Sequence, residues 1–195
     1  MKQLLTDDII DSSKQTQSNP FLFWFQSWFG GESSNEASTY DCSQCSCGKM
    51  NPRRVFGGID TGVNQYPWMA IILYQNDYKC GATLINDRYV LTTANCFHDY
   101  IEFSEENIIK NITVRLLEHD RSTDNETILI DRKVNKIIKH FLYSHDTLNN
   151  DIALVKFTEP VKLVGILSPA CLPTPKLSYE GYNGVTIGWS SVENR

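Results

Sequence analysis

Six cysteines are the side chains of this sequence with the clearest chemical potential. An even number of cysteines predicts three disulfides in an extracellular chain, and metal ligands or free thiols in a cytosolic one. Cys42 and Cys45 have the spacing of a zinc-ligand pair, but no second close pair follows them, which disfavours a zinc site. The six are Cys42, Cys45, Cys47, Cys80, Cys96 and Cys171.

Histidine and aspartate could supply acid–base chemistry. An imidazole has a pKa near neutrality, so beside a carboxylate it can take a proton from a serine hydroxyl during amide hydrolysis. Asp151 comes directly before an apolar run, where an aspartate could simply end the turn that starts at Asn149. The four histidines are His98, His119, His140 and His145.

The stretch Val90-Leu91-Thr92-Thr93-Ala94-Asn95-Cys96 gives Asp151 a more specific interpretation. It resembles the V-L-T-A-A-H-C signature of the trypsin-like (chymotrypsin-fold) serine proteases. The Cys-x-x-Cys-x-Cys-Gly segment at residues 42–48 is most similar to invertebrate secreted members of that family. Further stretches resemble motifs of that family in family order: Cys47-Gly48, Gly57-Gly58, Tyr66-Pro67-Trp68, Cys80-Gly81-Ala82-Thr83-Leu84-Ile85, Val114-Arg115-Leu116-Leu117-Glu118-His119-Asp120, Asn150-Asp151-Ile152-Ala153-Leu154-Val155, Cys171-Leu172-Pro173 and Val185-Thr186-Ile187-Gly188-Trp189.

The resemblance implies a catalytic site that lacks its base. Asp151 matches the triad aspartate, whereas Asn95 stands where the family has the general-base histidine. A carboxamide has no useful protonation equilibrium, so it cannot accept the serine proton. Its NH₂ group could still donate to the Asp151 carboxylate. We expect none of the four histidines to replace the base, and we expect the turn at Cys96 to direct His98 toward solvent.

The nucleophile is also absent from this sequence. No G-D-S-G-G motif occurs, and Gly188-Trp189-Ser190 resembles the family's G-W-G turn instead. Residues 55–195 number 141, while all-β barrel domains commonly run to roughly 200–250 residues. The resemblance therefore implies a first barrel without the second, and a chain without peptidase activity.

The resemblance also implies an activation site and disulfide pairs. Arg54 and Val55 match the family's cleavage site, although Phe56 is bulkier than the usual residue there. Cleavage would free the Val55 amine. The implied pairs are Cys80 with Cys96 and Cys47 with Cys171, and Cys42 with Cys45 is left by subtraction.

Two N-glycosylation sequons and one acidic stretch are further candidate sites. The sequons begin at Asn111 and Asn125 and predict glycosylation in a secreted chain. Some family members carry a calcium loop at the acidic stretch. We favour a solvated loop and expect no metal and no cofactor. The acidic residues of this stretch are Glu118, Asp120, Asp124 and Glu126.

Composition limits the partners of the chain. Its 18 basic and 23 acidic residues give a net charge of −5, which argues against nucleic acid. The aromatic run at residues 21–29 is far shorter than the roughly 20 residues that span a bilayer. We interpret it as a pro-segment patch, with partner or membrane-surface docking as the alternative. No transmembrane segment and no small-molecule ligand are expected.

The segments that must position these residues are short and β-rich. Residues 1–41 lack a persistent period and predict a disordered leader. Residues 42–54 form a cysteine-rich pro-segment, and residues 55–195 a partial peptidase domain. Six strands are predicted in that domain, and together they indicate an all-β Greek-key barrel, the first half of the two-barrel chymotrypsin-like fold. The predicted strands are residues 67–74, 79–85, 88–92, 112–117, 127–140 and 152–157.

Three functions compete on the sequence alone. The first is a secreted, non-catalytic serine protease homologue that binds a protein partner or substrate. The second is an incomplete chain of a trypsin-like endopeptidase lineage, and the third is a decayed product. Cysteine usage and the family favour an extracellular location, although no apolar signal segment follows Met1-Lys2-Gln3-Leu4-Leu5.

Overall fold

The structure, a computed structural model, describes residues 3–6, 46–51, 61–100, 105–123, 128–173 and 177–189. The chain divides into two compact units. The first contains Met1–Thr6, Ser46–Cys171 and Ile187–Arg195, and the second contains Asp7–Cys45 and Leu172–Thr186. In the second unit the rings of Tyr179 and Tyr182 pack edge to face, with their centroids 6.4 Å apart.

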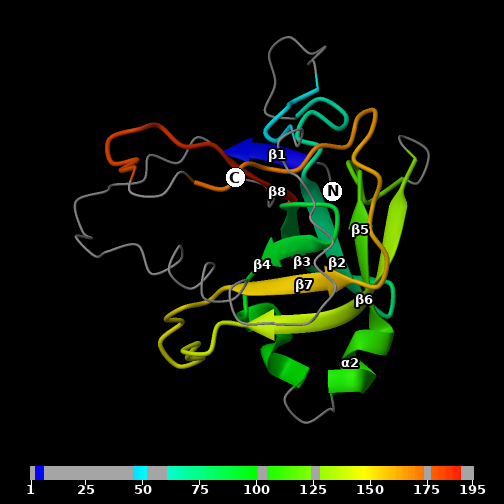
Figure 1. The fold of residues 1–195 in the computed structure, drawn as a ribbon, viewed down its shortest axis with the longest axis vertical. Coiled ribbons are helices and arrows are strands. Elements are labelled where there is room, and N and C mark those ends of the chain that lie inside the picture. The colour runs from blue at the N-terminus through cyan, green and yellow to red at the C-terminus, as the bar shows by residue number, and fades with distance from the viewer. Residues whose placement is uncertain are drawn as a thin grey trace, which may run out of the picture. The chain divides into compact units, whose positions relative to one another are not determined.

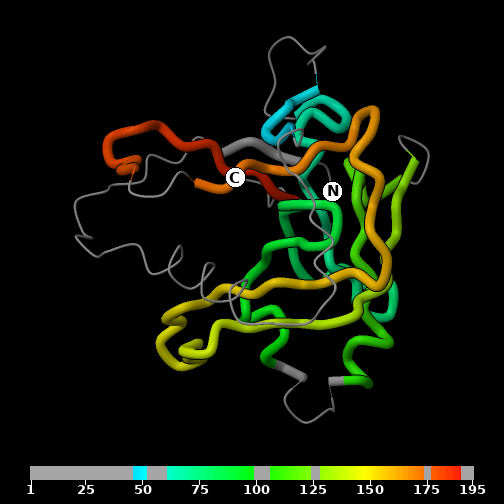
Figure 2. The backbone as a smooth tube through the Cα atoms, in the orientation of Figure 1, coloured from blue at the N-terminus to red at the C-terminus, as the bar shows by residue number. Residues whose placement is uncertain are grey.

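A closed six-stranded barrel forms the core of the first unit (Figures 1 and 2). All neighbouring strands are antiparallel, in the order β2-β3-β4-β7-β6-β5, and β5 closes the barrel by pairing with β2. This confirms the predicted all-β Greek-key barrel. The strands are β2 (Met69–Tyr74), β3 (Asp77–Leu84), β4 (Tyr89–Thr92), β5 (Ile112–Leu116), β6 (Ile130–Lys139) and β7 (Ala153–Phe157).

Strand β2 is apolar on both of its faces, which explains its near-continuous hydrophobic sequence. Side chains alternate across a strand. Ala70 and Ile72 therefore point into the barrel, where they join the main core. Met69, Ile71 and Leu73 point outward and pack with Trp189 in a second apolar cluster. Burying a side chain of this size stabilises the fold by about 1.5–3 kcal/mol.

Two helical elements and a strand after the barrel were not predicted from the sequence. Helix α2 (Glu105–Asn111) packs against β6 (Figure 1) and contributes the buried Ile108 to the core. The 3-10 helix η2 (Asn95–Tyr100) follows β4 at a place where we expected only a turn. Strand β8 (Thr186–Trp189) carries Trp189 to the outer apolar cluster.

A short strand lies at the start of the segment predicted to be a leader. Gln3–Thr6 form strand β1, which pairs with β8 in a two-stranded sheet. A strand edge offers unpaired backbone N–H and C=O groups, so even a short extended segment without a hydrophobic period can pair with it. The rest of residues 1–41 lies outside the described residues. No helix in the described part of the chain has the length and apolar character needed to cross a membrane.

Candidate active site

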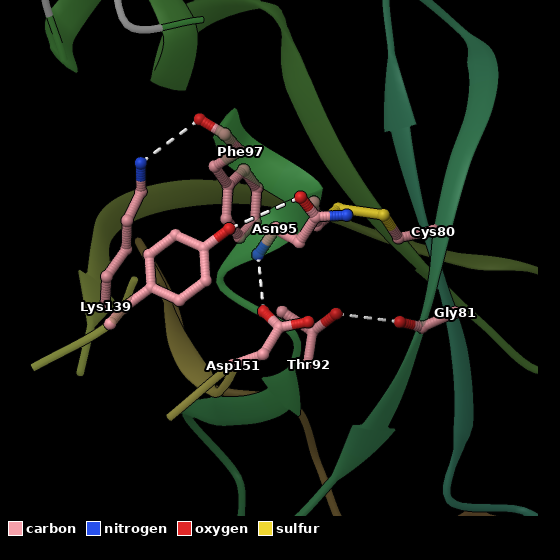
Figure 3. Close-up of a disulfide and its surroundings, with 9 residues drawn as sticks. Cys80, Gly81, Thr92, Asn95, Phe97, Lys139 and Asp151 are labelled. Carbon is pink, nitrogen blue, oxygen red and sulfur yellow. Dashed lines mark hydrogen bonds between the residues drawn. A yellow bond between two sulfur atoms is a disulfide. The ribbon is translucent and has the colours of Figure 1, made fainter. Parts of the chain in front are cut away.

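The barrel register brings Asn95 and Asp151 together. Thr92 at the end of β4 pairs with Ala153 at the start of β7, so the residues just beyond these two strand ends are neighbours. Asn95 is the first residue of η2 and Asp151 lies two residues before β7. The backbone N–H of Asn95 donates to Oδ1 of Asp151 across 2.6 Å (Figure 3). The structure therefore joins the two residues that the family resemblance had put together.

The bond between these residues differs from the expected one. We expected the carboxamide of Asn95 to donate to Asp151, but the backbone N–H makes that bond. The first N–H groups of a helix have no partner within the helix, and the one at Asn95 meets the carboxylate directly. The exposed carboxamide turns elsewhere, and its Oδ1 accepts a hydrogen bond from the Tyr143 hydroxyl across 3.3 Å.

Tyr143 is the site residue that the sequence did not reveal. Burial raises the pKa of its hydroxyl, and the negative charge of Asp151 raises this pKa further. The hydroxyl therefore stays protonated and donates to Asn95. A single tyrosine in the polar segment before Asp151 was its only sequence signal.

Two histidines lie on the other side of Tyr143. Nδ1 of His145 is 3.4 Å from the Tyr143 hydroxyl oxygen, and the His145 ring stacks on His98 with centroids 3.2 Å apart. His98 is half-buried and its stacking partner His145 is exposed, so the pair lies at the surface of the loop. The link from His145 to Asn95 runs through the Tyr143 hydroxyl, which separates this imidazole from Asn95.

The remaining two histidines are buried in the barrel structure. His119 accepts a hydrogen bond at its backbone carbonyl from Nε1 of Trp189 across 3.0 Å. Nδ1 of His140 accepts from the backbone N–H of Leu142 across 3.1 Å. Burial lowers the pKa of His140, which favours its neutral form. Both contacts tie these residues into the barrel, and their non-catalytic role stays a prediction.

Two disulfides fix the surroundings of the site. Cys80 in β3 joins Cys96 in η2 (Figure 3), and Cys47 joins Cys171 across 124 residues of sequence. These are the same pairs that the family resemblance implies. Gly48 follows Cys47 with a φ of +68°, and a Cβ placed there would lie 3.0 Å from Sγ of Cys171. Glycine is required at this position for both reasons. Cys42 and Cys45 lie outside the described residues.

The segments that flank the expected cleavage site are hydrogen-bonded to each other. The side-chain Nδ2 of Asn51 donates to the carbonyls of Asn64 and Ile166 across 2.7 and 3.0 Å, and its backbone N–H donates to Gln65 across 3.1 Å. Arg54 and Val55 themselves lie outside the described residues, so cleavage there stays a prediction.

The two described acidic residues after β5 contact other residues of the same chain. Glu118 lies 3.7 Å from the Arg115 guanidinium. Asp120 accepts bonds from the hydroxyl and backbone N–H of Ser122 across 2.6 and 3.0 Å, and these bonds hold its pKa well below the usual range. Asp124 and Glu126 lie outside the described residues. Among the residues that are described, no group of His, Cys, Asp or Glu could hold a metal ion.

Of the two sequon asparagines, only Asn111 is described. It ends α2 and donates from Nδ2 to the carbonyl of Asn107 across 2.8 Å, and Thr113 of the same sequon is buried in β5. Asn125 lies outside the described residues. Glycosylation at both stays a prediction.

Comparison with known proteins decides the family. The Trypsin family model matches residues 55–195. The chain belongs to the trypsin family. It is 39% identical over 158 residues to venom serine protease 34 of Apis mellifera, a match that covers 76% of this chain and 37% of the relative. It is 32% identical over 171 residues to the Spaetzle-processing enzyme of Drosophila melanogaster, covering 76% and 42%.

A solved structure of the family shares the fold. The Drosophila Grass clip serine protease of the Toll pathway matches with a TM-score of 0.56 and 26% identity, over 68% of this chain and 40% of that one. This trypsin-family chain thus spans about two-fifths of the length of these relatives. Trypsin-like serine protease homology, the chymotrypsin fold and disulfides are therefore established for it.

Proposed function

We propose that residues 1–195 act as a non-catalytic trypsin-family homologue that binds a protein and does not hydrolyse it. The observation that carries this proposal is the carboxamide of Asn95, which accepts a bond from Tyr143 at the position where the family resemblance implies the general base. The Asp151 carboxylate and the disulfide frame remain in place around it. Removing the base from a triad costs most of the catalytic rate, since the nucleophile is then not activated.

The loop before Asp151 supports a binding role. Phe141 and Leu142 are 79% and 59% exposed, although both are large apolar side chains. The loop is held in shape by two bonds: Nδ2 of Asn150 donates to the Leu142 carbonyl across 3.0 Å, and the backbone N–H of Ser144 donates to Asn149 across 3.1 Å. Exposed apolar side chains on an ordered loop favour contact with a protein segment.

The location and domain division follow from the same proposal. Two disulfides and the relationship to a venom protease support an extracellular protein. We divide the chain into a leader (residues 1–41), a cysteine-rich pro-segment (42–54) and the peptidase-family domain (55–195). The start of the family match at Val55 supports the last boundary.

A second candidate is a segment of a longer chain from a trypsin-like endopeptidase lineage. The relatives' lengths favour it, since the matches cover only about two-fifths of each. Sequencing the transcript beyond both ends tests this candidate. A downstream G-D-S-G-G segment would support it, and a stop codon after Arg195 would sink it. Asn95 predicts an inactive product in either case.

The direct test of the proposed function is hydrolysis. Residues 1–195 are assayed on fluorogenic peptide amides before and after limited cleavage at Arg54, with the processing protease removed and an active trypsin as positive control. We expect rates equal to buffer for both forms. Turnover that a serine-directed inhibitor abolishes would overturn the proposal.

A further inference from the structure

The sequon at Asn111 lies at the junction of a helix and a strand of the barrel (Figure 1). Asn111 is the last residue of α2, and Ile112 and Thr113 are the first two residues of β5. N-glycosylation sequons ordinarily lie in surface loops. Here the middle residue belongs to the core, since the Ile112 side chain is 1% exposed. The folded position of this sequon therefore differs from that of an ordinary acceptor site.

The sheet encloses the hydroxyl of Thr113. Thr113 is 8% exposed, and its Oγ1 accepts a hydrogen bond from Nζ of Lys133 across 3.1 Å. In the barrel, Thr113 pairs with Leu73 of β2 on one side and with Lys133 of β6 on the other. The acceptor motif requires a hydroxyl at its third residue, so a glycosyltransferase must reach this group as well as the asparagine.

Further contacts hold Asn111 itself. Its backbone carbonyl accepts a hydrogen bond from the N–H of Gln75, in the turn between β2 and β3, across 2.9 Å. Its Nδ2 donates to the carbonyl of Asn107 across 2.8 Å. An enzyme that draws the sequon into its own active site must break these bonds and separate β5 from both neighbouring strands. Opening a core strand in this way costs a large part of the free energy of folding.

The order of synthesis leaves time for an earlier modification. Strands β6 and β7 follow Asn111 in the chain, and β7 ends at Phe157, roughly 46 residues later. At about 5–20 residues per second, these residues take about 2–9 s to synthesise. During this time the strand that supplies Lys133 and the strand that completes the barrel are not yet present. The Thr113 hydroxyl is then accessible.

We propose that Asn111 is glycosylated on the nascent chain, before β6 and β7 complete the barrel, and that the folded barrel does not accept a glycan at this position. In the transfer, Nδ2 attacks the anomeric carbon of an oligosaccharide carried on a lipid diphosphate. A bond forms between Nδ2 and that carbon, the bond from the carbon to the diphosphate oxygen breaks, and the lipid diphosphate leaves with the electron pair. Nδ2 gives one of its two protons to a base of the transferase.

The completed fold is compatible with the glycan. The proton that remains on Nδ2 can still be donated to the Asn107 carbonyl. Asn107 and Lys110 of α2 are exposed, so the sugar leaves the barrel on the solvent side of the helix. This modification requires the extracellular location proposed above and does not depend on the absence of hydrolysis. A secreted chain without the glycan would overturn the modification and leave the location unaffected.

Two forms of one chain test the timing. Residues 1–195 with Asn125→Gln keep Asn111 as their only sequon. In the first assay this chain is translated behind a cleavable signal peptide into microsomes. In the second, the same chain is refolded without glycan, with its disulfides formed, and is incubated with solubilised oligosaccharyltransferase and a lipid diphosphate-linked oligosaccharide. A peptide of residues 107–117 confirms that this enzyme is active.

Glycan occupancy at Asn111 is measured as a mass increase that an N-glycan amidase reverses. We expect the translated chain to be modified and the refolded chain to be at least about tenfold less occupied, because the sequon is protected by the fold. Val114→Asp places a charge in the core and leaves the sequon intact, so it should gain occupancy in the second assay. Glu106→Gln changes an exposed residue of α2 and should stay protected.

Any of three results overturns the proposal. They are the absence of glycan from the translated chain, equal occupancy of the translated and refolded chains, and no gain for Val114→Asp over Glu106→Gln in the second assay.

Discussion

The backbone N–H of Asn95 donates to Oδ1 of Asp151, and this 2.6 Å bond does not depend on which side chain residue 95 carries. It joins the start of η2 to the approach to β7 through a group that every residue except proline has. We therefore expect a substitution at position 95 to leave this backbone bond in place. The same bond explains why the carboxamide is free to turn toward Tyr143.

Tyr143 should report on the charge of Asp151. Asp151→Asn removes a negative charge that disfavours the tyrosinate, so the raised pKa of Tyr143 should fall toward its ordinary value while the contribution of burial remains. Titration followed by ¹³C NMR of the labelled tyrosine Cζ atoms checks this. Tyr182, which is 76% exposed, serves as the internal control and should not respond. An unchanged Tyr143 titration would contradict the assigned proximity.

His140 should make the barrel less stable in weak acid. Its folded-state pKa is lowered by burial, so the unfolded chain takes up a proton first as pH falls below about 6.5. The free energy of unfolding should therefore decrease from pH 6.5 down to the folded-state pKa of His140, and be unaffected by this group above pH 6.5. His140→Asn keeps an acceptor near the Leu142 N–H and should flatten the decrease. Urea unfolding at a series of pH values measures the free energy of unfolding of both proteins. An equally steep decrease in the variant would argue against His140 as the cause.

Phe97 should anchor η2, and hence Asn95, to the core. Its side chain is 1% exposed and its carbonyl accepts a bond from Nζ of Lys139 across 3.1 Å (Figure 3). Phe97→Ala should cost about 3–5 kcal/mol of folding free energy, as for other buried phenylalanines. Phe141→Ala is the matched control, because Phe141 is 79% exposed and should change stability by no more than about 0.5 kcal/mol. Equal costs in chemical unfolding would refute the assigned packing.

The two disulfides should contribute unequally. Cys80 and Cys96 are 16 residues apart and Cys47 and Cys171 are 124 apart, so the second pair restricts the unfolded chain more. Loop-closure entropy predicts a loss of about 3 kcal/mol for Cys80→Ala with Cys96→Ala, and about 5 kcal/mol for Cys47→Ala with Cys171→Ala. Unfolding in urea under oxidising conditions compares the two double variants. A larger loss from the shorter loop would contradict the entropic account.

The barrel strands could be predicted because their sequences combine β-branched runs with polar turns. The strand predicted at residues 112–117 is β5 (Ile112–Leu116), and the one predicted at 152–157 is β7 (Ala153–Phe157). Helix α2 could not be predicted in the same way, since seven residues cover barely two turns and show no clear period. Strand β1 was missed because its pairing depends on the edge of β8, far along the chain.

At the site, the positions could be predicted but the contacts could not. Motif order placed Asn95 and Asp151 together, because strand register follows from the fold. The partner of the Asn95 carboxamide is decided by the loop conformation that brings Tyr143 and His145 near, with Leu148 and Asn150 at positive φ. No local sequence pattern encodes that approach.

Peptide-amide hydrolysis by wild type and Asn95→His, measured side by side on residues 1–195, tests the central claim most directly. The claim is that residues 1–195 keep the backbone bond between residue 95 and Asp151 but contain neither a histidine at position 95 nor a G-D-S-G-G motif. Restoring the imidazole should therefore leave both proteins at the rate of buffer, with the Asn95→His fold unchanged by circular dichroism. Cleavage by either protein that a serine-directed inhibitor abolishes would contradict the claim.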